Sequence, residues 1–575
     1  MKIKFGLILP LAVFAAQAFW HARDKSATYD EPAHLAISRL ISVTEHQDYD
    51  VGHPPFIREL FGLPLRFMDP SLPGIPPPEV SESVPLALRP QGNLYVYANL
   101  FLYQNRVPAD TLLLAARAVS IVLALILGLI IYLFAGKLYG ERAGIFSLWM
   151  FAFCPNLIAH GSLVTTDMGG VAAAAAFLYS ALLYFEKRTA LNILACGITL
   201  GLALGAKFNN LILPVLFTAL VLIRGSDRRA WTDIVNIGFL SWSTLCLLYG
   251  FDRVFTPHLF EIPPFLRYLP LPDSFIRGIL SGSYHNARGH GAFFMGEYSS
   301  GGWKSYFPVA FLLKTPMVTI GLIALALLGA ALRPKSLRFE ETLLLLPLAA
   351  LLAFSVNSKL NIGLRHILLA YPLLLIFAGR IAPKKTAVLA AIVAVLALET
   401  LSAAPDYLAF FNRAAGGPDK GMRYLSDSNL DWGQDLKGLG RFLKDEGGSE
   451  VLLSYFGTAP ALAYGIRAQG LPTVWEYPKS GHINSASPKK EFCAVSVTNL
   501  QAVYFPDREL YSWLLSREPV KKIGHSIYVY DVTDDLEAQK KFMEIYGRTG
   551  EREKYLRQAE RVKRLERSLS ERNRS

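Results

Sequence analysis

Long apolar segments recur along most of this chain, and they constrain its fold more than any other feature. An α-helix needs roughly twenty apolar residues to cross a bilayer, where no water satisfies an open backbone. Eleven runs of about this kind lie at residues 5–20, 112–135, 143–160, 168–185, 190–207, 209–223, 232–250, 307–332, 341–357, 366–382 and 386–402. The sequence therefore predicts a polytopic α-helical membrane protein with about eleven spans.

The composition agrees with this class of protein. Of the 575 residues, 52% are hydrophobic and only 18% are charged, which is too apolar for a soluble multidomain protein. The net charge of +12 does not indicate a nucleic-acid-binding protein, because many basic residues lie in short turns between the apolar segments. Cys154, Cys196 and Cys246 lie inside apolar segments and Cys493 stands alone, so no disulfide framework is expected.

Alternate turns between the apolar segments are consistently basic. They carry Lys2 and Lys4, Lys137 and Arg142, Lys187 and Arg188, Arg224, Arg228 and Arg229, Arg333, Lys335 and Arg338, and Arg380, Lys384 and Lys385. Because Lys and Arg accumulate in cytoplasmic loops, these turns are predicted to face the cytoplasm from an inner membrane. Ala16-Gln17-Ala18 resembles a signal-peptide cleavage site; cleavage there is an alternative that changes no other side assignment.

The other turns then face outward, and the C-terminal part follows them. We expect residues 1–402 to form the membrane domain, with long outer loops at 21–110 and 251–307. Residues 403–535 are predicted to form a small extracytoplasmic α/β domain. Strand-like runs at 451–456, 493–497 and 526–530 alternate there with helical stretches at 434–443 and 507–515. Residues 536–575 are predicted to form a charged helical tail, either a solvated amphipathic helix or a frayed end.

Two adjacent carboxylates, Asp30 and Glu31, follow the first apolar segment on the outer side. Adjacent helical residues point about 100° apart, so these two carboxylates are expected to do different jobs. Either could take a proton from a reacting group, and the alternative is a helix cap, because Asp-Glu-Pro is a favourable helix start. A helix there would stack His34 with both carboxylates, as a metal ligand or as a hydrogen-bonding group.

Further candidates lie on the same predicted side. Asp167 begins an Ala-rich span, as a helix cap or as a carboxylate held at the membrane surface. His53 precedes two prolines in a rigid turn and is an optional site residue. Lys207 ends a span, where a snorkelling anchor is the alternative to a phosphate ligand.

Several cations are candidates for binding a phosphate. Lys314 lies about two turns inside a span, so it needs a partner, either a buried carboxylate or a lipid phosphate. Arginine suits bidentate phosphate contacts. A basic cradle is therefore expected from Arg365, His366, Lys359, Arg288 and His290, each of which has an interfacial anchor as its alternative. The stretch from Asp427 to Asp435 resembles a calcium loop only superficially and is predicted to be a turn before a helix.

A set of short motifs resembles a known family. The motifs are Tyr29-Asp-Glu-Pro-Ala-His34, His53-Pro-Pro55, Leu163-Val-Thr-Thr-Asp167, Gly201-Leu-Ala-Leu-Gly-Ala-Lys207, Gly302-Trp-Lys-Ser-Tyr-Phe-Pro308, Lys314-Thr-Pro316 and Asn361-Ile-Gly-Leu-Arg-His366. Over about residues 1–400 the chain resembles the GT-C glycosyltransferases that use a polyprenyl-phosphate sugar, the group of protein O-mannosyltransferases and lipid A aminoarabinose transferases. Ser426-Asp-Ser-Asn-Leu-Asp-Trp-Gly-Gln-Asp435 is similar to a stretch in an uncharacterised bacterial branch.

The resemblance implies a glycosyltransferase that inverts the anomeric centre, with Asp30 as base, Asp167 as the second acidic motif and Lys207 as a phosphate ligand. The donor would be a polyprenyl-phosphate-linked sugar and the acceptor an extracytoplasmic lipid, protein or glycan. No organic cofactor is expected, and a divalent metal is left open. Two alternatives are a secondary transporter of an envelope precursor, disfavoured by the long outer loops, and a non-catalytic envelope-glycan assembly protein.

Overall fold

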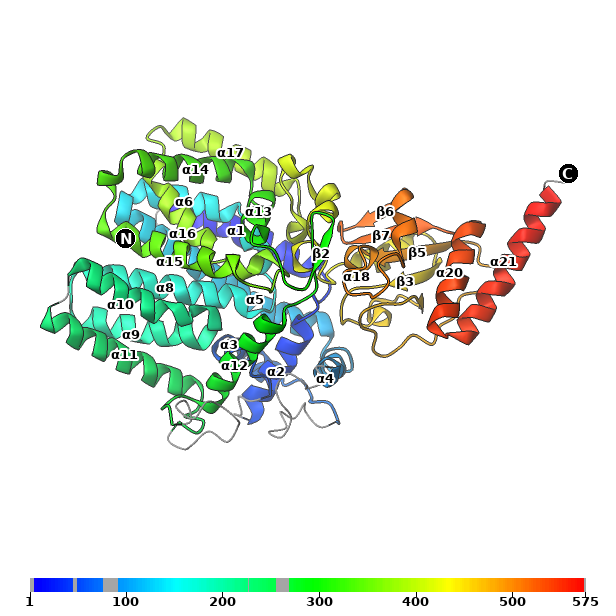
Figure 1. The fold of residues 1–575 in the computed structure, drawn as a ribbon, viewed down its shortest axis with the longest axis horizontal. Helices are drawn as coiled ribbons and strands as arrows, with labels where there is room; N and C mark the ends of the chain where they lie inside the picture. Colours follow the sequence, from blue (N-terminus) through cyan, green and yellow to red (C-terminus); the bar gives the residue numbers. More distant parts are fainter. Residues whose placement is uncertain (1–4, 45–48, 76–91, 226, 255–267, 573–575) are drawn as a thin grey trace.

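The computed structural model describes residues 5–44, 49–75, 92–225, 227–254 and 268–572. A large helical body contains the N-terminus, and a smaller part with a β-sheet lies beside it (Figure 1). The last helix extends from the sheet to the end of the molecule that lies farthest from the helical body.

Helices occupy all eleven apolar segments. They are α1 (Phe5–Asp24), α5 (Ala109–Tyr139), α6 (Glu141–Ala152), α7 (Pro155–His160), α8 (Thr166–Glu186), α9 (Ala190–Ala206), α10 (Leu213–Arg224), α11 (Arg228–Leu248), α13 (Tyr306–Lys314), α14 (Met317–Leu332), α15 (Phe339–Val356), α16 (Ala370–Ala378) and α17 (Thr386–Leu401). Two apolar segments are each divided into two helices at a proline. Pro155 is the first residue of α7 and Pro316 directly precedes α14, and proline has no backbone N–H to continue the preceding helix.

Three described helices are long and apolar enough to cross a membrane: Ala109–Tyr139, Thr166–Glu186 and Phe339–Val356. Shorter apolar helices accompany them, among them Ala190–Ala206 and Met317–Leu332. A multi-pass membrane protein is therefore supported, while the count of eleven spans stays a prediction.

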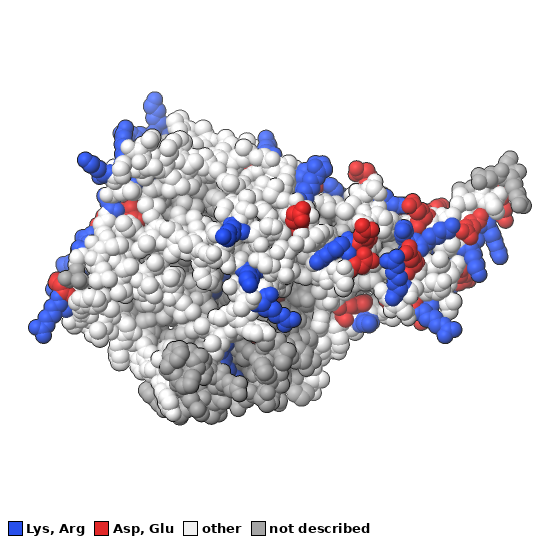
Figure 2. All heavy atoms as spheres, viewed as in Figure 1, with Lys and Arg blue, Asp and Glu red and all other residues white. Residues whose placement is uncertain are grey.

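The structure gathers the basic turns at one end of the helical body, whereas Lys2 and Lys4 lie outside the described residues. Ion pairs join neighbouring turns: Lys137 with Glu186 at 2.8 Å, Arg188 with Asp227 at 2.8 Å, Arg224 with Glu340 at 3.2 Å and Arg380 with Glu341 at 2.9 Å. Figure 2 shows lysine and arginine at this edge and a broad surface almost bare of charge beside it. This pattern is the one expected for a helical body whose middle lies in lipid.

The described parts of the two long loops fold back onto the helical body as short elements, whereas residues 45–48, 76–91 and 255–267 lie outside the described residues. These elements are α2 (Glu31–Thr44), α3 (Phe56–Met68), α4 (Gly92–Tyr103), α12 (Asp273–Arg288) and the hairpin β1 (Ala292–Phe294) and β2 (Glu297–Ser299). Helix α2 begins at Glu31-Pro32, where proline fits the first turn because no amide is needed there. Its residues from Glu31 to Ile41 are all buried, so it is part of the core.

The C-terminal part contains a five-stranded sheet with the strand order β4-β3-β5-β7-β6. Its strands are β3 (Glu450–Ser454), β4 (Ala468–Gly470), β5 (Glu491–Ser496), β6 (Lys521–Ile523) and β7 (Ile527–Asp531). Strand β3 is parallel to both of its neighbours, β4 and β5. Strand β7 is antiparallel to both of its neighbours, β5 and β6. The three predicted strands are present, and α18 (Leu436–Asp445) occupies the first predicted helix.

The helix predicted at 507–515 is wrong, because only the short 3-10 turn η12 (Ser512–Ser516) forms there. Tyr511 and Leu514 are buried, and the Tyr511 hydroxyl donates to the Pro472 carbonyl at 2.6 Å. Tertiary packing, rather than helical periodicity, determines the backbone of this segment.

Two helices, α20 (Leu536–Thr549) and α21 (Arg552–Arg572), form the end of the chain. Helix α20 buries Phe542 and Tyr546, and Gln539 donates to the Glu491 carboxylate of the sheet at 3.0 Å. Arg561 of α21 forms a buried ion pair with the same carboxylate. The beginning of the predicted tail is therefore attached to the sheet, and most of the remainder of α21 is exposed.

Candidate active site

Five ionisable side chains from distant parts of the chain meet in one cluster. Arg365 lies between two carboxylates, with its Nη1 3.7 Å from Asp30 Oδ2 and 3.7 Å from Asp167 Oδ2. Lys207 forms an ion pair with the other oxygen of Asp167. Asp427 completes the cluster, because its charge acts on both Asp30 and Arg365. We call these five residues the charged cluster.

Helix ends position most of the charged cluster. Asp30 precedes α2, and its carbonyl accepts the His34 amide at 3.1 Å. Asp167 lies in the first turn of α8, where the positive end of the helix dipole favours a carboxylate. Lys207 has an extended backbone between α9 and the 3-10 turn η2 (Phe208–Ile212). Arg365 lies in the 3-10 turn η5 (Leu364–Ile367).

Asp30 has the surroundings of a carboxylate that could accept a proton. The Tyr95 hydroxyl donates to Asp30 Oδ1 at 3.2 Å, and about a quarter of the Asp30 side chain (26%) is exposed. Burial raises the pKa of Asp30, and the nearby Asp427 and Asp167 charges raise it further, whereas Arg365 lowers it. A carboxylate whose pKa moves toward neutral pH is a better general base.

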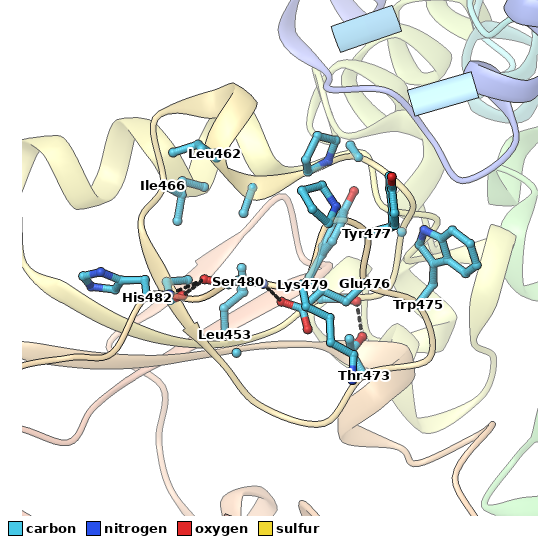
Figure 3. Close-up of a pocket in the computed structure, with 18 of the residues that line it drawn as sticks. Leu453, Leu462, Ile466, Thr473, Trp475, Glu476, Tyr477, Lys479, Ser480 and His482 are labelled. Carbon is cyan, nitrogen blue, oxygen red and sulfur yellow. Dashed lines mark hydrogen bonds between the residues drawn. The ribbon is translucent and has the colours of Figure 1, made fainter. Parts of the chain in front are cut away.

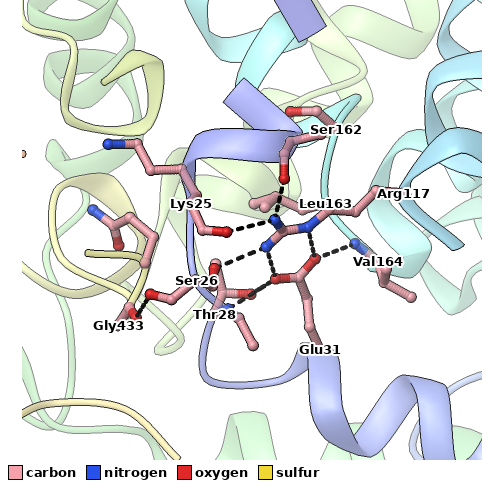
Figure 4. A network of polar contacts seen from close by, with 12 residues as sticks. Lys25, Ser26, Thr28, Glu31, Arg117, Ser162, Leu163, Val164 and Gly433 are labelled. Atoms are coloured by element: carbon pink, nitrogen blue, oxygen red, sulfur yellow. Dashed lines mark hydrogen bonds and ion pairs between the residues drawn. The ribbon is translucent and has the colours of Figure 1, made fainter. Parts of the chain in front are cut away.

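Glu31 points away from the charged cluster. Its carboxylate forms a bidentate ion pair with Arg117, with Nε–Oε1 2.8 Å and Nη2–Oε2 2.5 Å, and both side chains are fully buried (Figure 4). The backbone amides of Thr28 and Val164 also donate to it at 2.8 Å. The structure therefore gives Glu31 the position of a structural tie between α2, α5 and the turn before α8.

His34 and His53 form a separate pair, with their ring centroids 4.9 Å apart. Arg58 Nε donates to His34 Nδ1 at 3.4 Å, and Thr166 lies 3.3 Å from His53 Nδ1. Burial lowers the pKa of both rings, for His53 to about 4, so both are neutral at pH 7. The structure does not stack His34 on Asp30 and Glu31, and within the described residues no group of three His, Cys, Asp or Glu side chains could hold a metal ion.

Lys314 has a partner of a kind that the sequence did not indicate. Its buried ammonium donates to the carbonyl oxygens of Leu408 at 2.9 Å, of Phe410 at 3.0 Å, and of Asn429. The expected partner was a carboxylate or a lipid phosphate. The main chain after α17 folds against the end of α13 and supplies three dipoles instead, so no phosphate is required there.

The other predicted cations lie in α12 or beside it. Lys359 Nζ donates to the Ala287 carbonyl at 3.3 Å, and Arg288 is exposed. His290 Nδ1 lies 3.2 Å from His285 Nε2, and the His290 ring stacks edge-on against Tyr504.

A small pocket opens beside the charged cluster. Lys207, Arg365 and His366 line one part of it. Its other walls are mainly apolar and come from α8, η2, α10, α15 and the two residues after η5, including Ile212, Leu213, Pro347, Leu351, Leu368 and Leu369. The pocket is small, about 30 Å³, so it has room for only part of a ligand. Its chemistry, cations beside apolar walls, suits the point where a phosphate meets a hydrocarbon chain.

Sequence reasoning missed four residues around Arg365. The Trp432 ring lies 4.3 Å from the Arg365 guanidinium carbon, and Tyr95 contacts Asp30. Asp427 Oδ2 accepts the Tyr504 hydroxyl at 2.5 Å, and burial raises the pKa of Asp427. The dense acidic stretch from Ser426 to Asp435 was a signal for Asp427 and Trp432, whereas nothing in the sequence around Tyr95 and Tyr504 distinguishes them.

One family model matches part of the chain. Residues 109–251 match the model of the family described as dolichyl-phosphate-mannose-protein mannosyltransferase. This segment is about a quarter of the chain. The match confirms the predicted resemblance to the protein O-mannosyltransferase group. It indicates that the protein is a glycosyltransferase. No curated protein sequence matches the chain.

Two solved structures are similar to the chain at low identity. ArnT from Cupriavidus metallidurans bound to undecaprenyl phosphate is 13% identical with a TM-score of 0.48, over 92% of this chain and 98% of that chain. The Archaeoglobus fulgidus oligosaccharyltransferase tethered with an acceptor peptide is 10% identical with a TM-score of 0.46, over 86% of this chain and 69% of that chain.

Proposed function

We propose that this protein transfers a sugar from a polyprenyl-phosphate donor to an acceptor hydroxyl outside the cytoplasm. The observation that carries the proposal is the charged cluster, in which a candidate base lies 3.7 Å from an arginine that also lines a pocket with apolar walls. The match to a mannosyltransferase family supports the reaction class.

The reaction needs two kinds of group, and the charged cluster contains both. Asp30 accepts the proton of the acceptor hydroxyl while that oxygen forms a bond to the anomeric carbon of the donor. The bond from this carbon to the phosphate oxygen breaks, and the polyprenyl phosphate leaves with one more negative charge. Arg365 and Lys207 stabilise this developing charge. Attack from the side opposite the leaving phosphate inverts the anomeric carbon.

Replacing Arg365 tests the donor pocket. Arg365→Gln removes a charged phosphate partner, so the Kd of the detergent-solubilised protein for undecaprenyl phosphate should rise about 10- to 100-fold. Arg380→Gln is the matched control, because Arg380 is similarly buried (16% exposed against 13%) and ion-paired but lies among the basic turns. Isothermal calorimetry provides the measurement. Equal affinities of Arg365→Gln and the unchanged protein would exclude Arg365 as a phosphate ligand.

The proposal also includes eleven spans in an inner membrane, with the charged cluster and the C-terminal sheet outside. Single cysteines test it in a background in which the four buried native cysteines are replaced. Ser283, Ser516 and Ser336 are all exposed. A membrane-impermeant thiol reagent should label Ser283→Cys and Ser516→Cys in intact spheroplasts and should label Ser336→Cys only after permeabilisation. Labelling of Ser336→Cys in intact spheroplasts would place the basic turns outside and contradict the proposed topology.

A further inference from the structure

A second and larger pocket, of about 410 Å³, lies in the C-terminal part (Figure 3). It opens where β3 and β4 end: residues 455–462 follow β3, and residues 473–482 follow β4. These two strands are parallel, so their carboxyl ends meet at one edge of the sheet, a common position for a ligand. The volume is within the usual range of small-molecule sites, roughly 300–1,000 Å³.

The pocket wall that follows β4 is held in place by its own hydrogen bonds. The Thr473 hydroxyl donates to the Tyr455 carbonyl, and the Ser480 hydroxyl donates to the Ala468 carbonyl at 2.5 Å. The Ser480 amide donates to Glu476 Oε1 at 2.8 Å. These hydrogen bonds fix the segment after β4 in place as one wall of the pocket.

The lining combines aromatic rings with polar groups of both charges. Figure 3 shows Trp475 and Tyr477 on one side of the pocket and Leu462, Ile466 and His482 on the other, with Glu476 and Lys479 between them. Among the described residues the buried Trp475 Nε1 has no hydrogen-bond partner, so a residue that lines the pocket carries an unsatisfied donor. Sugar rings have an apolar C–H face that stacks on aromatic rings and hydroxyls that bond to carboxylates, amines and indole N–H groups.

Contacts through Tyr95 and Tyr29 link this pocket to the candidate base. The Trp475 ring lies 5.7 Å from the Tyr95 ring, and the Tyr95 hydroxyl donates to Asp30. Thr458, which also lines the pocket, donates to the carbonyl of Tyr29, the neighbour of Asp30, at 2.7 Å. The Tyr95 side chain and the Tyr29 backbone therefore separate this pocket from Asp30 and link the two.

We infer that this pocket binds a sugar ring of the acceptor and presents that acceptor to Asp30. The inference rests on the proposed function, because it assigns a substrate class to the same reaction. The acceptor is then a glycan or a glycosylated molecule.

Saturation-transfer NMR on the full chain in detergent tests this inference with methyl glycosides of glucose, galactose, mannose, N-acetylglucosamine and rhamnose as probes. At least one should bind the unchanged protein. Tyr477→Ala should weaken its binding at least about tenfold, because the stacking face is lost. Tyr555→Ala is the matched control, because Tyr477 and Tyr555 are both 37% exposed and Tyr555 lies on α21. Trp475→Phe keeps a ring but removes the free N–H and should weaken binding about 2- to 10-fold.

Two results would overturn the inference: no glycoside binds the unchanged protein, or Tyr477→Ala binds as well as Tyr555→Ala does. Undecaprenyl phosphate binding is measured on the same samples and should be the same in all of these variants. Failure of the unchanged protein to bind this lipid, with glycoside binding intact, would contradict the proposed function instead. The two failures are therefore distinguishable.

Discussion

The Asp30→Asn protein should transfer sugar about 10²–10⁴ times more slowly than the unchanged protein. Asparagine keeps the size of the side chain and can still accept a hydrogen bond from Tyr95, but it cannot take the proton of an acceptor hydroxyl. Donor binding should change little, because the proposed phosphate ligands are Arg365 and Lys207. The measurement is the turnover number with a synthetic polyprenyl-phosphate sugar and an envelope extract as the source of acceptor.

The control for this substitution is Asp24→Asn. The Asp24 carboxylate is similarly exposed (20% against 26%), it is ion-paired, and it belongs to the same N-terminal region. Wild-type turnover in Asp30→Asn would exclude Asp30 as the base and make Asp167 the candidate instead.

The pH profile gives a second check on Asp30. Protonation abolishes a base, so activity should fall as the pH drops through the pKa of Asp30. Because burial raises this pKa, the loss should begin above the pH at which an ordinary aspartate titrates, about 3.9. An acid limb that follows an ordinary aspartate would contradict this assignment.

Breaking the Glu31–Arg117 pair should have the largest effect on stability. Arg117→Met leaves a carboxylate buried without its countercharge, which should lower the free energy of unfolding by about 3–5 kcal/mol. The double variant Arg117→Met with Glu31→Gln should recover much of this loss, because no unpaired charge then remains at this position. Thermal unfolding in detergent, followed by fluorescence, provides the measurement.

The exposed pair of Arg188 and Asp227 is the control for this experiment. Asp227 is 63% exposed, so Arg188→Met should cost at most about 1 kcal/mol. A similarly small loss in Arg117→Met would show that the Glu31 pair is not a structural tie.

The sequence predicted the helical body well, because hydrophobicity over roughly twenty residues is a local property. It also predicted that Asp30, Asp167, Lys207 and Arg365 lie on one side, since alternate turns must face the same side of a membrane. Their mutual distances could not be predicted, because these depend on how α2, α8, α9 and η5 pack.

Glu31 and Lys314 show where sequence reasoning reached its limit. The partner of Glu31 is Arg117, on a different helix, and the partners of Lys314 are backbone carbonyls near residues 408–429. Both partners are determined by long-range packing, and carbonyl oxygens leave no trace in side-chain composition. The motif from Ser426 to Asp435 was visible, but only the fold shows that Asp427 and Trp432 reach Arg365.

The position of Trp432 beside Arg365 has a consequence for biosynthesis. About 400 residues separate Asp30 from Asp427, and Lys25 is bound to Asp406 and Asp435 in the same late segment. At about 5–20 residues per second, a ribosome needs roughly 20–80 s to synthesise that interval. Under the proposed topology, the nascent chain therefore inserts most of its helices before the residues of the charged cluster meet. Under the proposed function and topology, activity would begin only after the segment around Trp432 has been exported and has folded back onto the helical body.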